Sequence, residues 1–428
     1  MERYNEYKDS GVQWLGEIPS HWGLRRTKYV WKETDSRSEF GSEQLLSVSQ
    51  YDGVREAQSD SRSESLKGYK IVKQDELVIN IMLAWLGGLG VSKHEGIVSP
   101  AYCVYKLQDA QNPRFLHYLY RTPMYLAEFA RHSTGIVPSR WRMYTDDFGE
   151  VLTLLPPIEE QDAMVAYLDT ATAKIDEAIA QQQKMIGLLN ERKQIIINNA
   201  VTKGLNPDAP MKDSGVEWIG EIPEHWEIKK LKHVCQAFGR IGFRGYSTTD
   251  LVDEGEGCIT LSPSNMRDGK MQYGRCTYLS WEKYEESPEI KVFNGDILFV
   301  KTGSTYGKSS IVEDLPLEAT INPQLLVFKN FTCNNMFLAN VLQSTAIKTQ
   351  VEISVIGGTI PTISQQKILN YVFPFPTEDE QYAIVEYVES KSAPINAAIK
   401  AAEKQISLLQ ERKQIIINDV VTGKVKVS

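Results

Sequence analysis

Two long stretches of the chain carry apolar residues at spacings that alternate between four and three. The first stretch reads Leu168, Thr172, Ile175, Ile179, Gln182, Ile186, Leu189, Lys193, Ile196 and Ala200. The second reads Val388, Ser392, Ile395, Ile399, Ala402, Ile406, Leu409, Lys413, Ile416 and Val420. This spacing is typical of a heptad seam, and its polar interruptions fall at matched places, so it predicts two paired helices. We assign a helix or subunit interface to Ile175, Ile179, Ile186, Leu189, Ile196, Ile395, Ile399, Ile406, Leu409 and Ile416.

Both stretches contain the same octapeptide, Glu-Arg-Lys-Gln-Ile-Ile-Ile-Asn. It occupies Glu191–Asn198 and again Glu411–Asn418, 220 positions later. A second repeat, Asp9–Trp22 and Asp213–Trp226, is offset by 204. Repeats of this kind indicate an internal duplication. The tryptophans of the second repeat predict a segment pinned onto a core, and the alternative is an aromatic pair that stacks on bases.

Each predicted helix begins after a proline-rich stop, Pro156-Pro157 in the first copy and Pro374-Phe375-Pro376 in the second. Acidic residues follow, which suits the positive end of a helix dipole. A helix over 158–201 would be about 66 Å long at 1.5 Å per residue. Lys193 and Lys413 lie on the seam, where they either extend to solvent or set the register against the partner helix.

The segments before the helices predict two domains of mixed α/β character. Apolar runs at 77–83 and 296–302 predict buried strands, and a glycine-rich loop follows each one. A further strand, a short helix and a Gly-Pro turn come next in both halves. We therefore expect domains at 1–155 and 204–373, separated and followed by helical segments at 156–203 and 374–428. Two such helices can pack antiparallel, with one domain at each end and a pseudo-twofold axis between them.

Composition changes this picture little. The chain has 428 residues, a hydrophobic content of 42% and a net charge of −8, which disfavours a uniformly basic surface but permits a local one. Five scattered cysteines without a CxxC pair indicate reduced thiols. The polar N-terminus predicts no signal peptide, and 77–91 is too short to span a bilayer, so we expect a cytoplasmic protein without membrane contact.

One glycine-rich stretch, Gly303–Ser309, resembles a phosphate-binding loop but is one residue short of the GxxxxGK[ST] pattern. Its continuation reads as extended rather than helical. We favour a strand-to-strand loop that offers hydroxyl groups and lysines to a DNA backbone, and a plain glycine turn with solvated lysines is the alternative.

Several loops combine basic residues with glycine and aromatic residues, a composition that fits a nucleic-acid surface. The alternative for any single residue is a solvated basic loop. The candidate DNA-binding residues are Lys93, Arg131, Ser139, Arg140, Trp141 and Arg142 in the first domain, and Arg240, Arg244, Lys301, Thr302, Ser304, Thr305, Tyr306 and Lys308 in the second.

Patterns that would indicate catalysis are missing from the sequence. The six histidines and the cysteines lack metal-ligand spacing, and neither GxSxG nor HExxH occurs. Asn322-Pro323 continues as Gln324-Leu325, which departs from the Asn/Asp-Pro-Pro-aromatic tetrad of base-modifying methyltransferases. We predict no catalytic residue, no metal site and no cofactor on this chain.

Taken together, the boxes ending in His21-Trp22 and His225-Trp226, the helix starts Pro156–Gln161 and Pro376–Gln381, and the repeated octapeptide make the whole chain resemble the specificity subunit of type I restriction–modification enzymes. The resemblance implies two target-recognition domains that each read half of a bipartite sequence in double-stranded DNA. It also implies an antiparallel coiled coil that spaces the halves and docks two modification subunits, together with two restriction subunits. S-adenosylmethionine, ATP and Mg²⁺ are then expected on these partners, which carry adenine methylation, translocation and cleavage.

Two other classes of function stay open from the sequence. One is a self-contained DNA methyltransferase, or a nucleotide-binding enzyme that uses Gly303–Ser309. The other is a coiled-coil adaptor that does not contact DNA.

Overall fold

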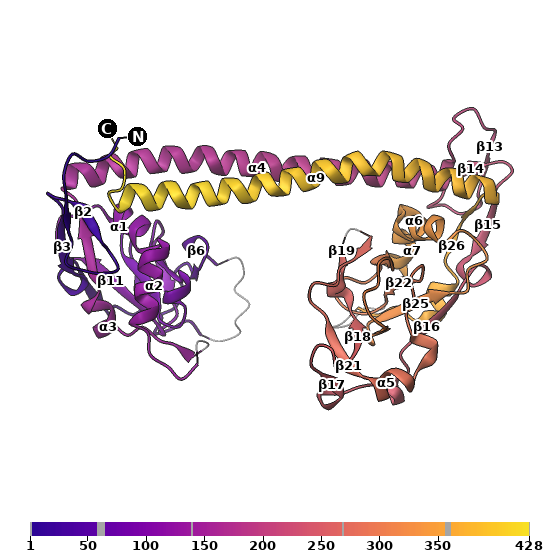
Figure 1. Cartoon of the computed structure of the whole chain (residues 1–428), viewed down its shortest axis with the longest axis horizontal. Coiled ribbons are helices and arrows are strands. Elements are labelled where there is room, and N and C mark those ends of the chain that lie inside the picture. Colours follow the sequence, from indigo (N-terminus) through magenta and orange to yellow (C-terminus); the bar gives the residue numbers. More distant parts are fainter. Residues whose placement is uncertain (1, 58–64, 138–139, 268, 356–360, 428) are drawn as a thin grey trace. The chain divides into compact units, whose positions relative to one another are not determined.

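The computed structural model describes residues 2–57, 65–137, 140–267, 269–355 and 361–427. The chain divides into two compact units, and each contains part of both long helices (Figure 1). The first unit comprises Met1–Gln183 and Glu403–Ser428, and the second comprises Lys184–Ala402. Each unit is therefore one globular domain together with one end of each helix.

The first unit is built on a four-stranded antiparallel sheet in the order β4–β11–β8–β9. Its strand β8 (Leu77–Asn80) is buried along its whole length, as the apolar run predicted. The other strands of the unit are β1 (Tyr7–Asp9), β2 (Glu17–Pro19), β3 (Gly23–Arg26), β4 (Trp31–Thr34), β5 (Leu46–Ser49), β6 (Gly53–Glu56), β7 (Lys70–Val72), β9 (Leu89–Val91), β10 (Gly96–Val98), β11 (Tyr102–Leu107) and β12 (Leu152–Leu155).

Short helices cover this sheet and begin at well-formed caps. In α1 (Pro113–Tyr120) the Asn112 side chain accepts hydrogen bonds from the backbone N–H groups of Arg114 and Phe115, while Pro113 fills the first helical position. Helix α2 (Pro123–Arg131) begins in the same way after Thr122. The remaining short helices are α3 (Thr145–Glu150), η1 (Thr27–Tyr29) and η2 (Ala84–Leu86).

The second unit repeats this plan and adds to it. A six-stranded sheet has the order β16–β25–β22–β23–β20–β19, and the buried strand β22 (Ile297–Val300) corresponds to β8. A second sheet has the order β17–β21–β18–β24. The strands are β13 (Met211–Asp213), β14 (Glu221–Pro223), β15 (Glu227–Lys230), β16 (Gln236–Gly239), β17 (Leu251–Val252), β18 (Gly257–Leu261), β19 (Met266–Arg267), β20 (Lys270–Met271), β21 (Thr277–Ser280), β23 (Ser309–Ile311), β24 (Ala319–Ile321), β25 (Leu325–Lys329) and β26 (Val372–Phe375).

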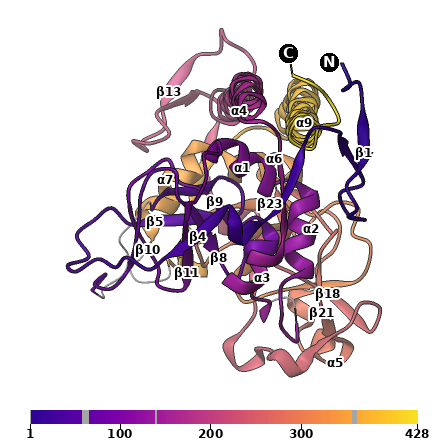
Figure 2. The same cartoon turned by 90° about the vertical axis from the view of Figure 1, so that its left-hand side faces the viewer.

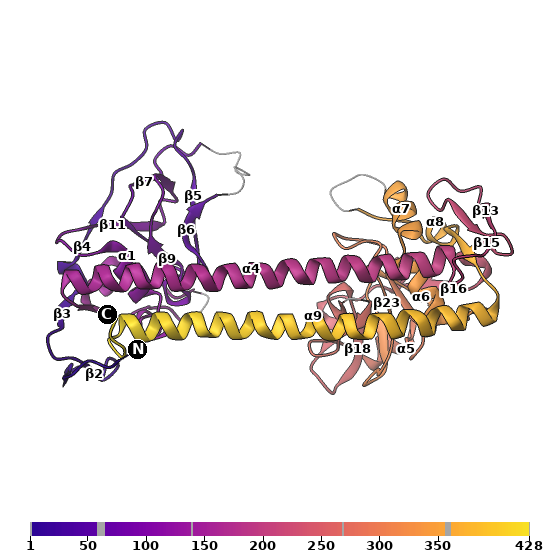
Figure 3. The same cartoon turned by 90° about the horizontal axis from the view of Figure 1, so that it is seen from above.

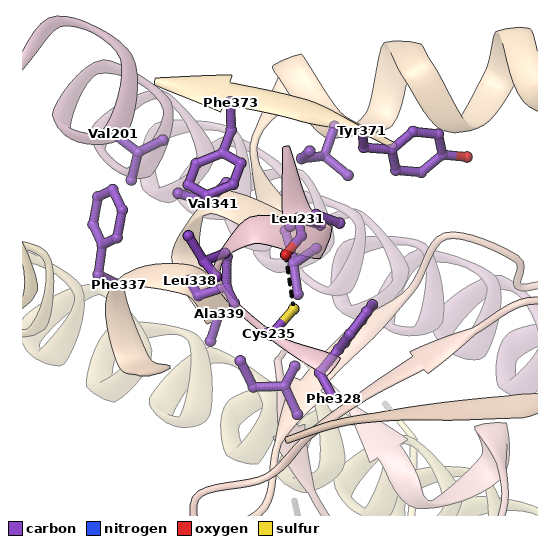
Figure 4. Close-up of a cluster of buried hydrophobic side chains, with 14 of the residues drawn as sticks. Val201, Leu231, Cys235, Phe328, Phe337, Leu338, Ala339, Val341, Tyr371 and Phe373 are labelled. Carbon is purple, nitrogen blue, oxygen red and sulfur yellow. Dashed lines mark hydrogen bonds between the residues drawn. The ribbon is translucent and has the colours of Figure 1, made fainter. Parts of the chain in front are cut away.

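The short helices of the second unit help to form its main core. Figure 4 shows one buried cluster with Phe337 and Leu338 of α6, Leu231 of η4, Phe328 of β25 and Val201 of α4 among its members. Full burial of each such large side chain contributes about 1.5–3 kcal/mol. The short helices are η4 (Leu231–His233), η5 (Gly242–Arg244), η6 (Thr248–Asp250), η7 (Pro263–Asn265), α5 (Trp281–Glu285), η8 (Pro288–Ile290), α6 (Asn335–Gln343), α7 (Thr345–Ser354) and α8 (Gln365–Leu369).

The two long helices are α4 (Ile158–Lys203) and α9 (Glu378–Val421). In the first unit Leu168 of α4 belongs to the same core as Val420 of α9, and further along Lys413 Nζ donates to Asp176 Oδ1 at 2.7 Å. In the second unit Lys193 Nζ donates to Asn396 Oδ1 at 2.9 Å. Rising numbers on one helix thus meet falling numbers on the other within each unit, which confirms the antiparallel pairing (Figure 3).

The repeated boxes clamp each globular domain to the start of a long helix. Glu160 of α4 accepts hydrogen bonds from Trp22 Nε1 at 3.1 Å and Tyr4 Oη at 2.9 Å, and its Oε1 lies 2.6 Å from His21 Nε2. Glu380 of α9 is bonded by Trp226 Nε1 at 3.1 Å. Trp22 and Trp226 are each 1% exposed, so they pin the boxes as expected, whereas Trp218 is 40% exposed and does not.

The two ends of the chain lie together in the first unit (Figure 2). Glu2 and Lys426 form a backbone bridge, and Tyr7 Oη donates to the carbonyl of Gly423 at 3.0 Å. Among the helices in the described ranges, none has the length and apolar character needed to cross a bilayer.

Candidate nucleic-acid interface

In the first unit, the loop that follows β8 is joined to the segment that precedes α3. Met143 N donates to the carbonyl of Ile81 at 3.0 Å, and Thr134 and Arg142 form a backbone bridge beside it. The rings of Trp85 and Trp141 meet edge to face, with centroids 5.2 Å apart. These backbone contacts, which we call the loop frame, fix the position of the loop residues.

The second unit builds the same frame after β22. Ile363 N donates to the carbonyl of Lys301 at 2.9 Å, and both residues lie 220 positions after their counterparts Met143 and Ile81. Thr302 and Thr362 form a backbone bridge, and Gly303 N donates to the carbonyl of Pro361 at 3.1 Å. The side chains at matched places differ, so one frame presents two chemically different surfaces.

The predicted DNA-binding residues of the first domain fall into different surroundings. Arg140 and Lys93 are exposed, and Arg142 and Trp141 are half-buried. Arg131 pairs with Glu128 at 2.5 Å, and this hydrogen bond raises the pKa of Arg131. Ser139 lies outside the described residues. Arg140, Lys93 and Arg142 therefore remain the cations best placed to meet a ligand.

Arg240 requires a correction, because it is only 6% exposed. Its Nε donates to the carbonyl of Ile321 at 3.1 Å, and its Nη2 donates to Thr320 Oγ1 at 3.0 Å. Its guanidinium also lies over the ring of Tyr246, 5.2 Å from the centroid. Burial lowers the pKa of Arg240. This side chain supports the loop from inside instead of offering its donors to DNA.

The other candidates of the second domain surround the loop after β22. Ser304 and Thr305 are exposed at its tip, and Lys301 and Thr302 are half-buried. Burial lowers the pKa of Lys301. Tyr306 packs against the main core, and Arg244 pairs with Glu289 at 3.5 Å. Ser304 and Thr305 are thus the most exposed of the predicted residues in this loop.

The resemblance of Gly303–Ser309 to a phosphate-binding loop does not extend to its structure. The amides of Tyr306, Gly307 and Lys308 donate to the carbonyls of Gly303, Val300 and Thr305 respectively, so they do not converge on a ligand. Strand β23 follows the loop where a nucleotide site needs a helix. Lys308 Nζ donates to the carbonyl of Met266 at 2.6 Å. This geometry supports the strand-to-strand interpretation.

Some residues of these surfaces were not singled out from the sequence. Ile136 is 95% exposed, and Gln324 lies against Gly303. The sequence did contain a signal for Ile136, which is an isoleucine within a Gly-Pro segment. It contained no signal for Gln324, because only the fold brings the start of β25 beside the loop. Within the described ranges, no group of three histidine, cysteine or acidic residues is arranged to hold a metal ion.

The ten residues assigned to the helix interface all lie on the less exposed face of α4 or α9. The octapeptide also contacts the globular domains, through the residue that follows the seam isoleucine in each copy. Ile197 is 3% exposed in the core of the second unit and Ile417 is 8% exposed in that of the first, whereas Ile196 and Ile416 are only half-buried. Asn198 also accepts a hydrogen bond from Thr345 N at 3.1 Å, at the start of α7.

The opposite face of each long helix carries exposed apolar residues at matched places. Leu188 is 57% exposed and its counterpart Leu408 is 50% exposed. Ile195 and Ile415 are 53% and 50% exposed, again 220 positions apart. We call these four residues the repeated stripe.

Comparison with known proteins relates the chain to one family. Residues 223–408 match the family model described as the type I restriction modification DNA specificity domain. The MjaVIII specificity subunit of Methanocaldococcus jannaschii is 28% identical over 65% of this chain, and the match covers 63% of that relative, less than two thirds of its length. The putative MjaX specificity subunit of the same organism is 25% identical over 96% of both chains.

A solved structure gives the same result for the fold. A chain from work on complex assembly and conformational transition of the type I R-M system has a TM-score of 0.64 and 16% identity. The match covers 95% of this chain and 99% of that one. The chain is therefore similar over its length to a type I restriction–modification specificity subunit, and its residues 223–408 match the DNA specificity domain of that family.

Proposed function

We propose that this chain is the non-catalytic DNA-reading subunit of a type I restriction–modification complex, with one half of a bipartite target read by each unit. The observation that carries the proposal is the repeated loop frame. Met143 with Ile81, and Ile363 with Lys301, make the same backbone contact beneath different side chains. A shared frame with different side chains suits two readers of different short sequences.

Two domains that each recognise a short DNA sequence weakly can together discriminate strongly between DNA sequences. A wrong base pair costs about 1–3 kcal/mol, so a half-site of a few pairs selects poorly against a genome. Linking both readers makes the second binding event intramolecular, which multiplies their selectivity. The negative net charge of −8 is compatible with this role if basic residues concentrate at the loops.

The repeated stripe supports two equivalent docking sites for modification subunits. The same leucine and isoleucine positions are exposed in both copies of the octapeptide region, so one partner surface can bind each copy. Two modification subunits would then supply S-adenosylmethionine and adenine methylation. Two restriction subunits, with ATP and Mg²⁺, would complete the complex. Such a complex would act on cellular DNA, which places the chain in the cytoplasm.

Methylation mapping tests the proposal. Genomic DNA from cells that produce this chain with its modification subunit should carry methyladenine in a split motif, and deletion of this chain should abolish it. Methylation by the isolated chain, or turnover of ATP by it, would instead favour a self-contained enzyme. Absence of sequence-dependent, salt-sensitive DNA binding by the complex would favour a structural adaptor.

A further inference from the structure

A cavity of about 320 Å³ lies in the second unit between α4 and the loop that leads into β23. Helices α6 and α7 close it from another direction, through Gln343 and Lys348. Three lysines line it: Lys193, Lys308 and Lys348. No carboxylate is among the lining residues of the described chain.

The hydrogen bonds of two of these lysines leave their positive charges without a counter-charge. Lys348 Nζ donates to Gln194 Oε1 at 2.7 Å, and Lys308 Nζ donates to the carbonyl of Met266 at 2.6 Å. Both acceptors are neutral, and neither lysine forms an ion pair with a residue of the described ranges. Each ammonium group has three donors, so further donors remain for a ligand.

A buried hydroxyl group in the same cavity has no partner. Ser309 is 4% exposed, it lines the cavity, and its Oγ makes no hydrogen bond with the described residues. A buried polar atom of this kind is costly unless a ligand or water satisfies it. An acceptor bound between the lysines would satisfy both the hydroxyl donor and the two charges.

The first unit fills the corresponding place with its own side chain. Arg121 corresponds to Gln343, counted from the matching caps Asn112 and Asn334, and its Nη1 donates to the carbonyls of Gly87 and Leu89 at 2.8 and 2.6 Å. Gly88 and Leu126 stand where the second unit has Lys308 and Lys348. The duplicated scaffold therefore does not need lysines here.

We propose that this cavity of the second unit binds a phosphate group. Phosphate offers several acceptor oxygens and a negative charge, which match two ammonium groups and one hydroxyl donor. The phosphate can belong to a DNA backbone or to a free phosphate-bearing molecule. The DNA source rests on the proposed function, whereas binding of the free anion does not.

The first test uses inorganic phosphate and the full chain. Phosphate titrated at constant ionic strength, against chloride, should raise the melting temperature of the wild-type chain. The double variant Lys308→Gln/Lys348→Gln and the single variant Ser309→Ala should lose most of this rise. Lys283→Gln removes one charge from a surface pair with Glu286, 2.7 Å apart and outside the cavity, and should keep the full response.

The second test uses the complex with its modification subunit and a DNA duplex of unrelated sequence. A phosphate contact contributes about 0.9 to the slope of log affinity against log salt concentration. A slope reduced by about that amount in the double variant, but not in Lys283→Gln, assigns the cavity to the DNA backbone. An unchanged slope with a lost response to inorganic phosphate assigns it to a free phosphate-bearing molecule. A wild-type chain that does not respond to phosphate, with an unchanged slope in the double variant, overturns the proposal.

Discussion

Glu160 shows how one carboxylate can hold a domain to a helix. It receives hydrogen bonds from Tyr4 and Trp22 and contacts His21. Burial alone would raise the pKa of Glu160, but these hydrogen bonds outweigh it and lower the pKa. The carboxylate is therefore kept ionised at neutral pH, as a hydrogen-bond acceptor at the start of α4.

We predict that Glu160→Gln lowers the free energy of unfolding by about 1 kcal/mol, the difference between hydrogen bonds to a charged and to a neutral acceptor. Trp22 Nε1 and Tyr4 Oη both donate to Oε2, so the amide oxygen can still accept both bonds, but without the charge that strengthens them. Urea unfolding followed by tryptophan fluorescence measures the change. The matched control is Glu159→Gln, which alters an exposed neighbour and should leave stability within about 0.5 kcal/mol. Equal losses in the two variants would contradict the clamp.

Arg240 acts through the structure of its loop. Removal of its guanidinium leaves the carbonyl of Ile321 and the hydroxyl of Thr320 without this donor. We predict that Arg240→Ala lowers stability by about 1–3 kcal/mol. DNA affinity should fall only where the domain is loosened, and the salt slope should be unchanged. A variant with unchanged melting temperature and a reduced salt slope would return Arg240 to the DNA-contacting set.

His117 makes the first unit sensitive to acid. Burial, with the positive charges of Arg121, Arg114 and Lys93, lowers its pKa to about 3, and its Nδ1 accepts a hydrogen bond from Val91 N at 3.2 Å. An unfolded histidine titrates near about 6.5. Its contribution to stability is thus complete above about pH 6.5 and is lost progressively as the pH falls toward about 3.

We predict that this one group removes on the order of 1–2 kcal/mol of stability between pH 7.5 and pH 5. Unfolding measured across that range in wild type and in His117→Gln gives the difference. The variant can be less stable at neutral pH, but its loss on acidification should be smaller. Parallel pH profiles for the two proteins would show that His117 does not titrate in this way.

The sequence shows which residues have side chains that suit DNA binding, but it does not show which of these side chains are exposed to solvent. Arg140 and Arg240 have the same chemistry and similar glycine-rich or aromatic neighbours. One is exposed and the other is enclosed by β24 and Tyr246. Contacts with β24, about 80 residues further along the chain, decide the outcome for Arg240, and local composition cannot reveal contacts at that separation.

Helices and strands were easier to predict than single contacts, because the periodicity of their apolar residues indicates which face of each element is packed. The seam marked both long helices, although Pro394 lies inside α9 and cannot donate a backbone hydrogen bond. The octapeptide was harder to interpret, since it packs in two directions. Ile196 faces the seam while Ile197 enters a domain core, and a heptad count reveals only the first.

The repeated stripe gives a prediction at this scale. Leu188→Ser with Leu408→Ser should change stability by less than about 0.5 kcal/mol, because both leucines are exposed. The same double variant should weaken association with the modification subunit at least tenfold, since exposed apolar side chains contribute mainly through a partner. Size-exclusion chromatography and calorimetry with the purified subunit measure this. The seam control Ile175→Ala, at a position 9% exposed, should reverse the pattern by lowering stability.

At the scale of the molecule, duplication allows each half to diverge while its connections remain. Lys413 with Asp176 and Lys193 with Asn396 are the same pair of positions, each displaced by 220. Glu160 and Glu380 are also 220 positions apart, whereas the boxes that they hold are displaced by 204. The repeat revealed this plan before the structure did, whereas the strand pairing of the second sheet of the second unit could not be inferred from it.

The continuity of both helices leads to a prediction about spacing. Each unit contains part of α4 and part of α9, so a change in one helix alone would misalign the seam. Seven residues inserted in both helices, between Ile179 and Ile186 and between Ile399 and Ile406, would keep the heptad phase. They would lengthen each helix by about 10 Å at 1.5 Å per residue.

If the helices set the distance between the two readings, the methylated motif of this double-insertion variant should keep both half-sites while its gap grows by about three base pairs, at about 3.4 Å per pair. Methylation mapping measures half-sites and gap in the same experiment. Seven residues inserted in α4 alone should abolish methylation, because the seam of that variant cannot align in both units. An unchanged gap in the double-insertion variant would show that the loops or the partner subunits, rather than the long helices, fix the spacing.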